Sequence, residues 1–223
     1  MCVRYAPAMP EPCLPIVREV IRDPSLVELV DGLFGRLGLH VTDTGERCVI
    51  EQTGGGLTLH EGDGPAEFTV ELERWRVERI AREADAAGPL GEVERFRVVA
   101  QLFTAATAAT LRQRRLASPV LRRLSGAEPL IHVRMMSPDP AAEPDVTHTL
   151  AHVARQWLVI PGLHGEPGRT FRMSLDDTLT YQRKASHLMR HESIGEWLAF
   201  SKWYRAWRPT VSRKGRWTEA RDA

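Results

Sequence analysis

The chain has 223 residues, 43% hydrophobic and 26% charged, a balance that excludes a wholly disordered chain and allows a sizeable core. A formal net charge of +1 gives no overall field to attract nucleic acid or anionic lipid, so we expect no nucleic-acid partner. The cysteines number three, are irregularly spaced and form no CxxC, which favours a reducing compartment, most simply the cytoplasm. No apolar run approaches the length of a membrane span, so the sequence predicts no transmembrane segment.

The N-terminal part divides at Asp23. Prolines recur in the first fifteen residues, so residues 1–22 are predicted to form a flexible leader. Asp23 and Pro24 are typical of a helix start, and apolar residues continue at spacings of three and four as far as Leu37. The following Gly38 predicts the end of this helix.

Short extended runs follow, separated by the glycine-containing turns DTGE, TGG and EGDGP; they span residues 39–42, 47–52, 56–60 and 67–72. Because the links are short, these strands are predicted to form an antiparallel meander. The apolar period changes from two to three or four at Arg74, which predicts a helix there.

A second helix is predicted over residues 92–116, and its later turns carry the small-residue tract TAATAAT at 104–110. Further strands are expected at 129–136, 157–160 and 170–175, the last two as a hairpin, and residues 181–207 are predicted to be helical. The sequence shows no internal repeat.

This order of elements resembles that of the sterol carrier protein 2-like domain: an amphipathic helix, a meander containing VTDTGE and GGGLTLHEGDG, the strand FTVEL leading into a helix, a second helix and a late strand. The resemblance covers residues 23–136 and implies an α+β fold, in which a mainly antiparallel or mixed sheet is covered by helices around an apolar cavity. Residues 137–223 would be a C-terminal extension packing on that domain, with a basic tail from about residue 209.

The expected cavity wall combines apolar helix positions, the small-residue tract and a C-terminal aromatic stripe. The candidate ligand-binding residues are Phe96, Val99, Phe103, Ala105, Ala108, Trp197, Phe200 and Tyr204. Small side chains cannot fill the space over a sheet of Val, Leu and Phe as larger ones would, so a gap is expected beside the tract. The alternative is that the layers pack fully and leave no cavity.

Histidines concentrate after Gly126, and two pairs have a four-residue spacing: His148 with His152, and His187 with His191. On a helix that spacing puts both imidazoles on one face, where with a third ligand they could hold zinc or iron. These four residues are therefore the candidate metal ligands, and no other cofactor is indicated. The alternative is partly exposed histidines bonded to their neighbours.

Signals for covalent or phosphate chemistry are weaker. Asp176 and Asp177 are adjacent and more typical of a helix cap than of acid–base catalysis. Cys48 lies in an apolar strand, which favours a packed thiol over a nucleophile. The glycines at 54–56 precede a strand and lack the helix that would hold a phosphate.

Trp207 extends the stripe of Trp197, Phe200 and Tyr204 at helical spacing, so these aromatics are predicted to pack on the domain. The basic tail beyond Pro209 is predicted to be a solvated end, with peripheral contact to a membrane surface as an alternative.

The sequence thus favours binding of an apolar or amphipathic small molecule, such as a lipid, sterol or acyl metabolite. The alternative is an enzyme on the same scaffold, for instance in secondary metabolism, using the histidine-rich half as its metal or acid–base site.

Overall fold

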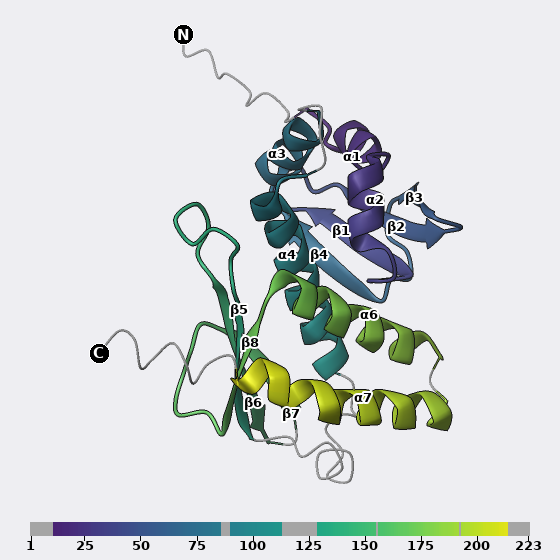
Figure 1. Cartoon of the computed structure of the whole chain (residues 1–223). Helices are drawn as coiled ribbons and strands as arrows, with labels where there is room; N and C mark the ends of the chain where they lie inside the picture. Colours follow the sequence, from purple (N-terminus) through teal and green to yellow (C-terminus); the bar gives the residue numbers. More distant parts are fainter. Residues whose placement is uncertain (1–10, 86–89, 113–128, 155, 192, 214–223) are drawn as a thin grey trace. The chain divides into compact units, whose positions relative to one another are not determined.

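The computed structural model describes residues 11–85, 90–112, 129–154, 156–191 and 193–213. It has an α+β fold in which the described residues form six helices and two mixed four-stranded sheets, as the sequence predicted for the class (Figure 1). The chain divides into two units, the first comprising Met1–Leu29 and Arg36–Leu90, the second Val30–Gly35 and Gly91–Ala223. This division does not coincide with the boundary near Met136 that the sequence suggested.

The first unit contains three helices and one sheet among its described residues. Its elements are α1 (Leu14–Val20), α2 (Pro24–Val30, up to Leu29), β1 (Arg36–Val41), β2 (Arg47–Thr53), β3 (Gly56–Glu61), β4 (Phe68–Leu72) and α3 (Arg74–Asp85). Helix α1 lies within the segment expected to be a flexible leader and buries Val17 and Val20, so that expectation is wrong for residues 14–20. The earlier residues 1–10 lie outside the described part.

Helix α2 begins where the sequence predicted it to begin. The Asp23 carboxylate accepts hydrogen bonds from the backbone amides of Ser25, at 2.7 Å, and Leu26, at 3.1 Å, which caps the first turn. The helix ends at Val30 instead of continuing to Leu37, because Leu37 and Gly38 belong to β1.

The first three strands form the predicted antiparallel meander, but β4 departs from it. The strand order is β3-β2-β1-β4, and β4 pairs in parallel with β1, with Leu39 opposite Val70. The FTVEL segment is a strand and leads into a helix at Arg74, as predicted. Strand β4 can return parallel to β1 because residues 62–67 cross one face of the sheet instead of making a hairpin turn.

The second unit contains α4 (Glu92–Leu111), β5 (Leu130–Met135), β6 (Val146–Val153), β7 (Gln156–Pro161), β8 (Arg169–Met173), α6 (Leu175–His191) and α7 (Ile194–Arg213). Strands β5 and β7 lie where the sequence predicted strands. The expected hairpin between β7 and the strand near Thr170 is wrong, because β8 pairs in parallel with β5 and the order is β7-β6-β5-β8. Residues 112–116 of the expected long helix lie beyond α4, and those after Arg112 are outside the described residues.

Helix α7 continues through Pro209 to Arg213 and buries Val211 completely. The expected solvated tail therefore does not begin at Pro209, and residues 214–223 lie outside the described part. Helix α6 begins with a capping box, in which Ser174 Oγ accepts a hydrogen bond from the Asp177 amide while the Asp177 carboxylate accepts one from the Ser174 amide. The predicted capping role of the acidic pair is confirmed for Asp177.

The two sheets share one topology although the sequence shows no repeat. In each, an antiparallel meander of three strands is followed by a fourth strand parallel to the first. Gly62 and Gly162 follow the third strands with φ values of 87° and 84°. Their amides donate bonds of 2.8 Å to the carbonyls of Arg47 and Thr147, respectively. Positions 47–48 of the first sheet therefore correspond to positions 147–148 of the second.

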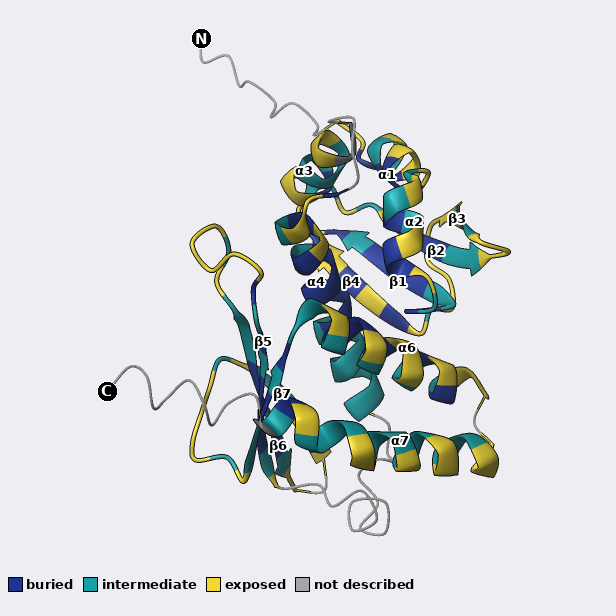
Figure 2. Cartoon of the chain, viewed as in Figure 1, coloured by how far each residue is buried: buried dark blue, intermediate teal, exposed yellow. Residues whose placement is uncertain are grey.

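The core of the second unit lies between one face of its sheet and the helices α4, α6 and α7. Its buried residues are Phe96, Ala100, Phe103, Ile131, Val133, Met135, Trp157, Phe171, Met173 and Val211. Figure 2 shows the buried residues of β5 and of the first half of α4 in dark blue. Among the helices of the described residues, none is long and apolar enough to cross a membrane.

Gly38 should be intolerant of any side chain. A Cβ there would lie 2.6 Å from Thr69 Oγ1 and 3.4 Å from the Cβ of Ala66, which belongs to the segment crossing the sheet. We expect Gly38→Ala to lower the free energy of unfolding by about 1–3 kcal/mol, measured by urea denaturation.

Gly56→Ala provides the control, because the nearest atom to its Cβ is the Thr53 carbonyl oxygen at 3.9 Å. Removing the Thr69 hydroxyl with Thr69→Ala should recover part of the loss in the double variant. Equal effects of the two glycine substitutions would contradict the steric explanation.

Candidate ligand site in the second unit

The inner face of the second sheet carries one deeply buried polar residue. In the strand register His148 lies opposite Val133, and Val133 lies opposite Phe171 on its other side. His148 is 5% exposed, so an imidazole lies among apolar neighbours at the centre of the sheet. A buried polar group in this position normally has hydrogen-bond partners for all its polar atoms.

One ring nitrogen of His148 has a partner on α4. Thr104 Oγ1 donates its proton to the Ala100 carbonyl at 2.7 Å, so this hydroxyl can act only as an acceptor towards His148 Nε2, 3.3 Å away. The proton of the neutral imidazole is therefore on Nε2. Nδ1 then carries a lone pair, and this buried atom has no hydrogen-bond partner among the described residues.

The electrostatic setting keeps His148 neutral. Burial lowers the pKa of His148 below its ordinary value of 6.5, because desolvation disfavours the charged imidazolium. At neutral pH the site therefore contains an uncharged acceptor. Such a group can accept a hydrogen bond from a ligand hydroxyl or N–H, or can remove a proton as a general base.

His148 and His152 do not form the helical pair that the sequence suggested. Both lie on strand β6, and a four-residue separation along a strand corresponds to roughly 13 Å. The ring of His152 instead packs edge-on against Trp157, with centroids 5.1 Å apart. The two histidines share a face of the sheet but lie too far apart to bind one metal ion, so the expected helical spacing is wrong for this pair.

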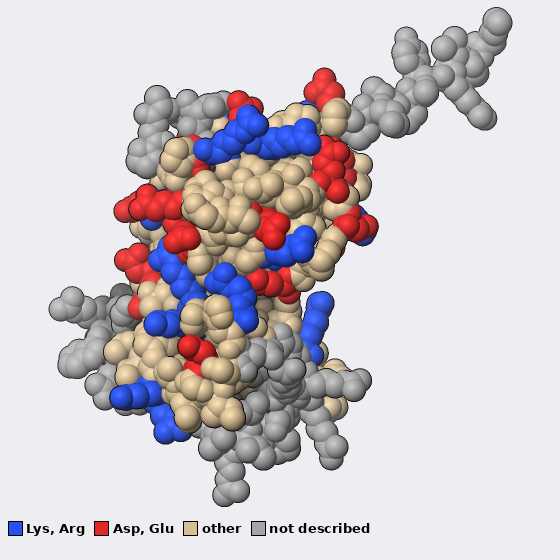
Figure 3. All heavy atoms as spheres, turned by 90° about the vertical axis from the view of Figure 1, so that its right-hand side faces the viewer, with Lys and Arg blue, Asp and Glu red and all other residues tan. Residues whose placement is uncertain are grey.

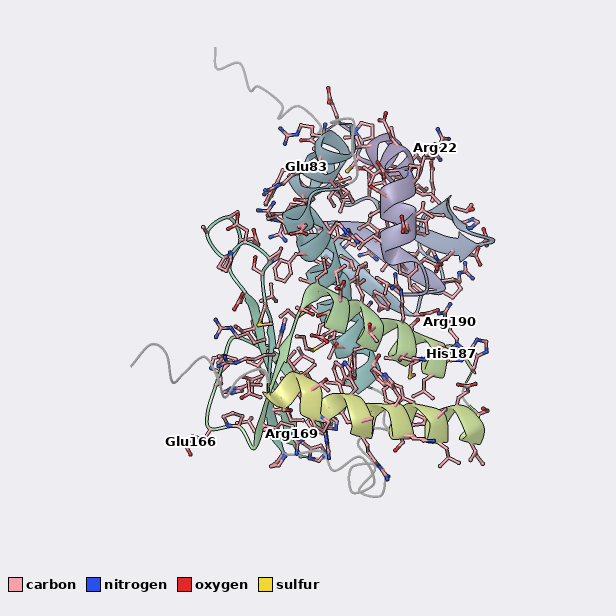
Figure 4. The ribbon with its side chains drawn as sticks, viewed as in Figure 1. Arg22, Glu83, Glu166, Arg169, His187 and Arg190 are labelled. Carbon is pink, nitrogen blue, oxygen red and sulfur yellow. The ribbon has the colours of Figure 1, made fainter. Side chains whose placement is uncertain are left out.

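The second histidine pair does lie on one helix face. The rings of His187 and His191 on α6 are 4.5 Å apart, and His187 Nε2 lies 3.2 Å from a carboxylate oxygen of Glu196 (Figure 4). Within the described ranges, no group of three or more His, Cys, Asp and Glu side chains is placed to hold a metal ion.

The other histidines near this sheet have structural partners. His132 lies opposite Thr149 in the register, so its side chain is on the face of the sheet opposite to His148. Its Nε2 donates to the His164 carbonyl at 3.0 Å, and Thr149 Oγ1 accepts a bond from the His164 amide at 2.9 Å. These bonds fix the segment that crosses the outer face.

The expected cavity residues fall into three groups. Phe96 and Phe103 are part of the packed core, and Val99 is also buried. Ala105 and Ala108 are half-buried on the later turns of α4. Trp197, Phe200 and Tyr204 are half-buried on α7, with Tyr204 packed against the core.

An aromatic cluster joins α6 and α7 over the sheet. Tyr181 stacks on Trp207 at 5.4 Å and contacts Phe103 of α4 at 6.0 Å, while Phe171 of β8 meets Tyr204 at 6.5 Å. The predicted packing of the C-terminal stripe is thus confirmed for Tyr204 and Trp207. Burial raises the pKa of Tyr204, although the nearby cations Arg208 and Arg169 oppose this rise (Figure 4).

Helix α6 carries a second group of buried polar atoms. Gln182 is 3% exposed, and neither the nitrogen nor the oxygen of its amide has a hydrogen-bond partner within the part of the chain that the structure describes. One turn later, the buried hydroxyl of Ser186 has no partner in that part either. Unsatisfied amides of this kind cost free energy unless water or a ligand bonds to them.

The two thiols that the structure describes in the first unit are buried and protonated. Cys13 and Cys48 are free and buried, and burial raises the pKa of each to about 11. They are therefore protonated and unreactive at neutral pH, as the packed-thiol interpretation of Cys48 predicted.

The His148–Thr104 contact was not predicted from the sequence. It joins residues of α4 and β6, which are distant in the sequence. The four-residue spacing of the histidines in HTLAH suggested a helix where the structure has strand β6. The signal that could have found it is the alternation in residues 146–153, where Val146, His148 and Leu150 alternate with Thr147 and Thr149.

Comparison with known proteins gives no match to a family model, to a curated protein or to a solved structure.

Acid should destabilise the protein in part through His148. Because its pKa is lower in the folded than in the unfolded state, its stabilising contribution is complete above about pH 6.5 and is lost as the pH falls towards the lowered value, by up to about 1.4 kcal/mol per pH unit. We expect His148→Gln to flatten the pH dependence of unfolding free energy between about pH 7.5 and about pH 5.5. The exposed His191→Gln is the control, and equal slopes in parent and His148→Gln would contradict the assignment.

Gln182→Leu should stabilise the ligand-free protein. The substitution removes two unsatisfied polar atoms and keeps a similar volume, so the free energy of unfolding should rise by about 1 kcal/mol. The exposed Gln156→Leu on β7 should give no such gain. A large loss of stability on Gln182→Leu would show instead that the amide makes favourable hydrogen bonds in the folded protein, and would contradict this prediction.

Proposed function

We propose that the second unit binds an apolar or amphipathic small molecule, with His148 Nδ1 accepting a hydrogen bond from its polar group. The observation that carries this proposal is a buried, neutral imidazole whose acceptor atom has no partner among the residues that the structure describes, set in an otherwise apolar layer. Ligand sites are typically apolar with a few polar groups that fix orientation.

The surroundings of His148 favour the same function. One turn beyond Thr104 on α4 is Ala108, and Thr107 lies two turns beyond the core residue Ala100. Small residues at these positions leave room that larger side chains would fill. Ala105 is rotated by about 100° from Thr104, so it is a weaker candidate for the wall than the sequence suggested.

The acceptor character of Nδ1 narrows the ligand class. A carboxylate has no proton to donate, whereas a hydroxyl or an amide N–H has one. A sterol or fatty alcohol, or an acyl amide, therefore fits better than an ionised fatty acid. This ligand class agrees with the proposed relation to sterol carrier protein 2-like domains, and the free buried cysteines agree with a cytoplasmic location.

A second candidate function is enzymatic, and it rests on the same atom. A neutral imidazole whose Nε2–H is held by Thr104 has Nδ1 available as a general base. In that case His148 would take a proton from a substrate hydroxyl or activated C–H. Native mass spectrometry of the purified protein separates the two functions, since a binder retains a co-purified molecule whose mass stays unchanged on incubation.

The test of binding uses a fluorescent fatty alcohol and its methyl ether, which lacks the donor proton. Thr107→Phe and Ala108→Phe should fill the ligand space and weaken binding of both probes by at least about tenfold, with little change in thermal stability. His148→Leu should weaken binding of the alcohol alone, also by about tenfold, because only the alcohol donates to Nδ1.

Ala206→Phe, on the exposed side of α7, is the matched control and should leave both affinities unchanged. In a fully packed core, Thr107→Phe and Ala108→Phe would instead lower stability by about 1–3 kcal/mol. That result, together with no probe binding to the parent protein, would refute the proposal.

A further inference from the structure

Helix α7 has two opposite ridges of different character. Its inward ridge includes Tyr204, Trp207 and Val211, which pack on the sheet. On the opposite side, at spacings of four, four and three residues, lie Ile194, Leu198, Lys202 and Arg205, here called the outer ridge. Figure 2 shows exposed residues recurring along α7.

The outer ridge begins with large apolar side chains that the fold does not cover. Ile194 is 82% exposed and Leu198 is 68% exposed, the highest values among the exposed large hydrophobic residues of the described part. The neighbouring exposed residues Gly195, Ala199 and Ala206 are small and leave the ridge accessible. Two bulky apolar residues one turn apart at the free side of a helix are typical of a contact surface.

The second half of the outer ridge is basic. Lys202 and Arg205 are exposed, and Glu196, the only acidic residue of α7, is directed to His187 on α6. The outer ridge therefore carries positive charge and apolar surface with no acidic side chain. The face drawn in Figure 3 carries both acidic and basic residues.

We propose that the outer ridge of α7 binds an anionic membrane surface. Ile194 and Leu198 enter the boundary between headgroups and acyl chains, while Lys202 and Arg205 bind anionic headgroups. In this mode of binding the helix lies along the membrane surface. This site is separate from the predicted tail contact and does not depend on ligand binding at His148.

A lipid surface fits the ridge better than nucleic acid does. Bases stack on aromatic side chains, and the aromatic residues Tyr204 and Trp207 of α7 face inward, whereas the outward residues are aliphatic. The basic residues alone could bind any polyanion. Ile194 and Leu198 contribute favourable free energy only when their side chains are buried against an apolar surface, which a membrane provides.

The test is co-sedimentation of the parent chain with vesicles of phosphatidylcholine alone or with about 30 mol% phosphatidylserine. The parent should bind the anionic vesicles and bind the neutral ones far less. The pair Lys202→Gln and Arg205→Gln should weaken binding by roughly fivefold for each basic residue removed. The pair Ile194→Ser and Leu198→Ser should weaken it at high salt as well as at low salt, since apolar insertion is not screened.

Matched controls remove the same side-chain types elsewhere. Arg22→Gln with Lys184→Gln removes one exposed arginine and one exposed lysine, and Val153→Ser with Leu163→Ser removes exposed apolar residues from the other side of the unit. These pairs should bind vesicles as the parent does. Failure of the parent to prefer anionic vesicles would overturn the proposal, as would control pairs as weak as the ridge pairs.

The aliphatic pair also separates a membrane from other polyanions. If the parent binds heparin beads as well as it binds vesicles, and Ile194→Ser with Leu198→Ser leaves vesicle binding unchanged, the ridge is a general polyanion site and the membrane proposal is wrong. Circular dichroism of each variant confirms that α7 remains folded.

Discussion

The parallel pairing of the fourth strand with the first determines the layout of each unit. It makes β1 and β5 central strands, with neighbours on both sides, and it leaves β3, β4, β7 and β8 at the edges. A parallel return requires the chain to cross the sheet. In each unit a short segment after the third strand makes that crossing, and in the second unit the hydrogen bond from His132 to the His164 carbonyl holds it on the sheet.

The pairing also decides which side chains face the helices. Alternation along β5 puts Ile131, Val133 and Met135 on the covered face, and the register then brings His148 of β6 and Phe171 of β8 to the same face. Shifting β6 by one residue would move His148 to the outer face of the sheet and bring Thr149 to the covered face instead. The candidate site is therefore a consequence of register, with Thr104 on α4 completing it.

Patterns among neighbouring residues predicted most of the helices and strands. They did not predict how strands distant in the sequence pair with one another. The cap at Asp23, the change of period at Arg74 and the strand at Leu130–Met135 depend on neighbouring residues, so sequence alone located them. Whether β4 and β8 form hairpins or return in parallel depends on contacts between distant residues. In the candidate site, the small-residue tract and the aromatic stripe were recognised in the sequence. The His148–Thr104 contact was found only in the folded structure, because it joins residues of α4 and β6.

The shared topology explains why ligand binding is assigned to the second unit alone. Cys48 lies opposite Leu39 as His148 lies opposite Val133, so the two residues occupy corresponding positions on the two sheets. The buried, protonated thiol of Cys48 packs as a small apolar side chain and needs no strong hydrogen-bond partner. An imidazole at the same position has two ring nitrogens, of which Thr104 can engage only one. The topology itself therefore does not require an imidazole at this position, and this is one reason why we propose that the Nδ1 acceptor of His148 serves a bound molecule.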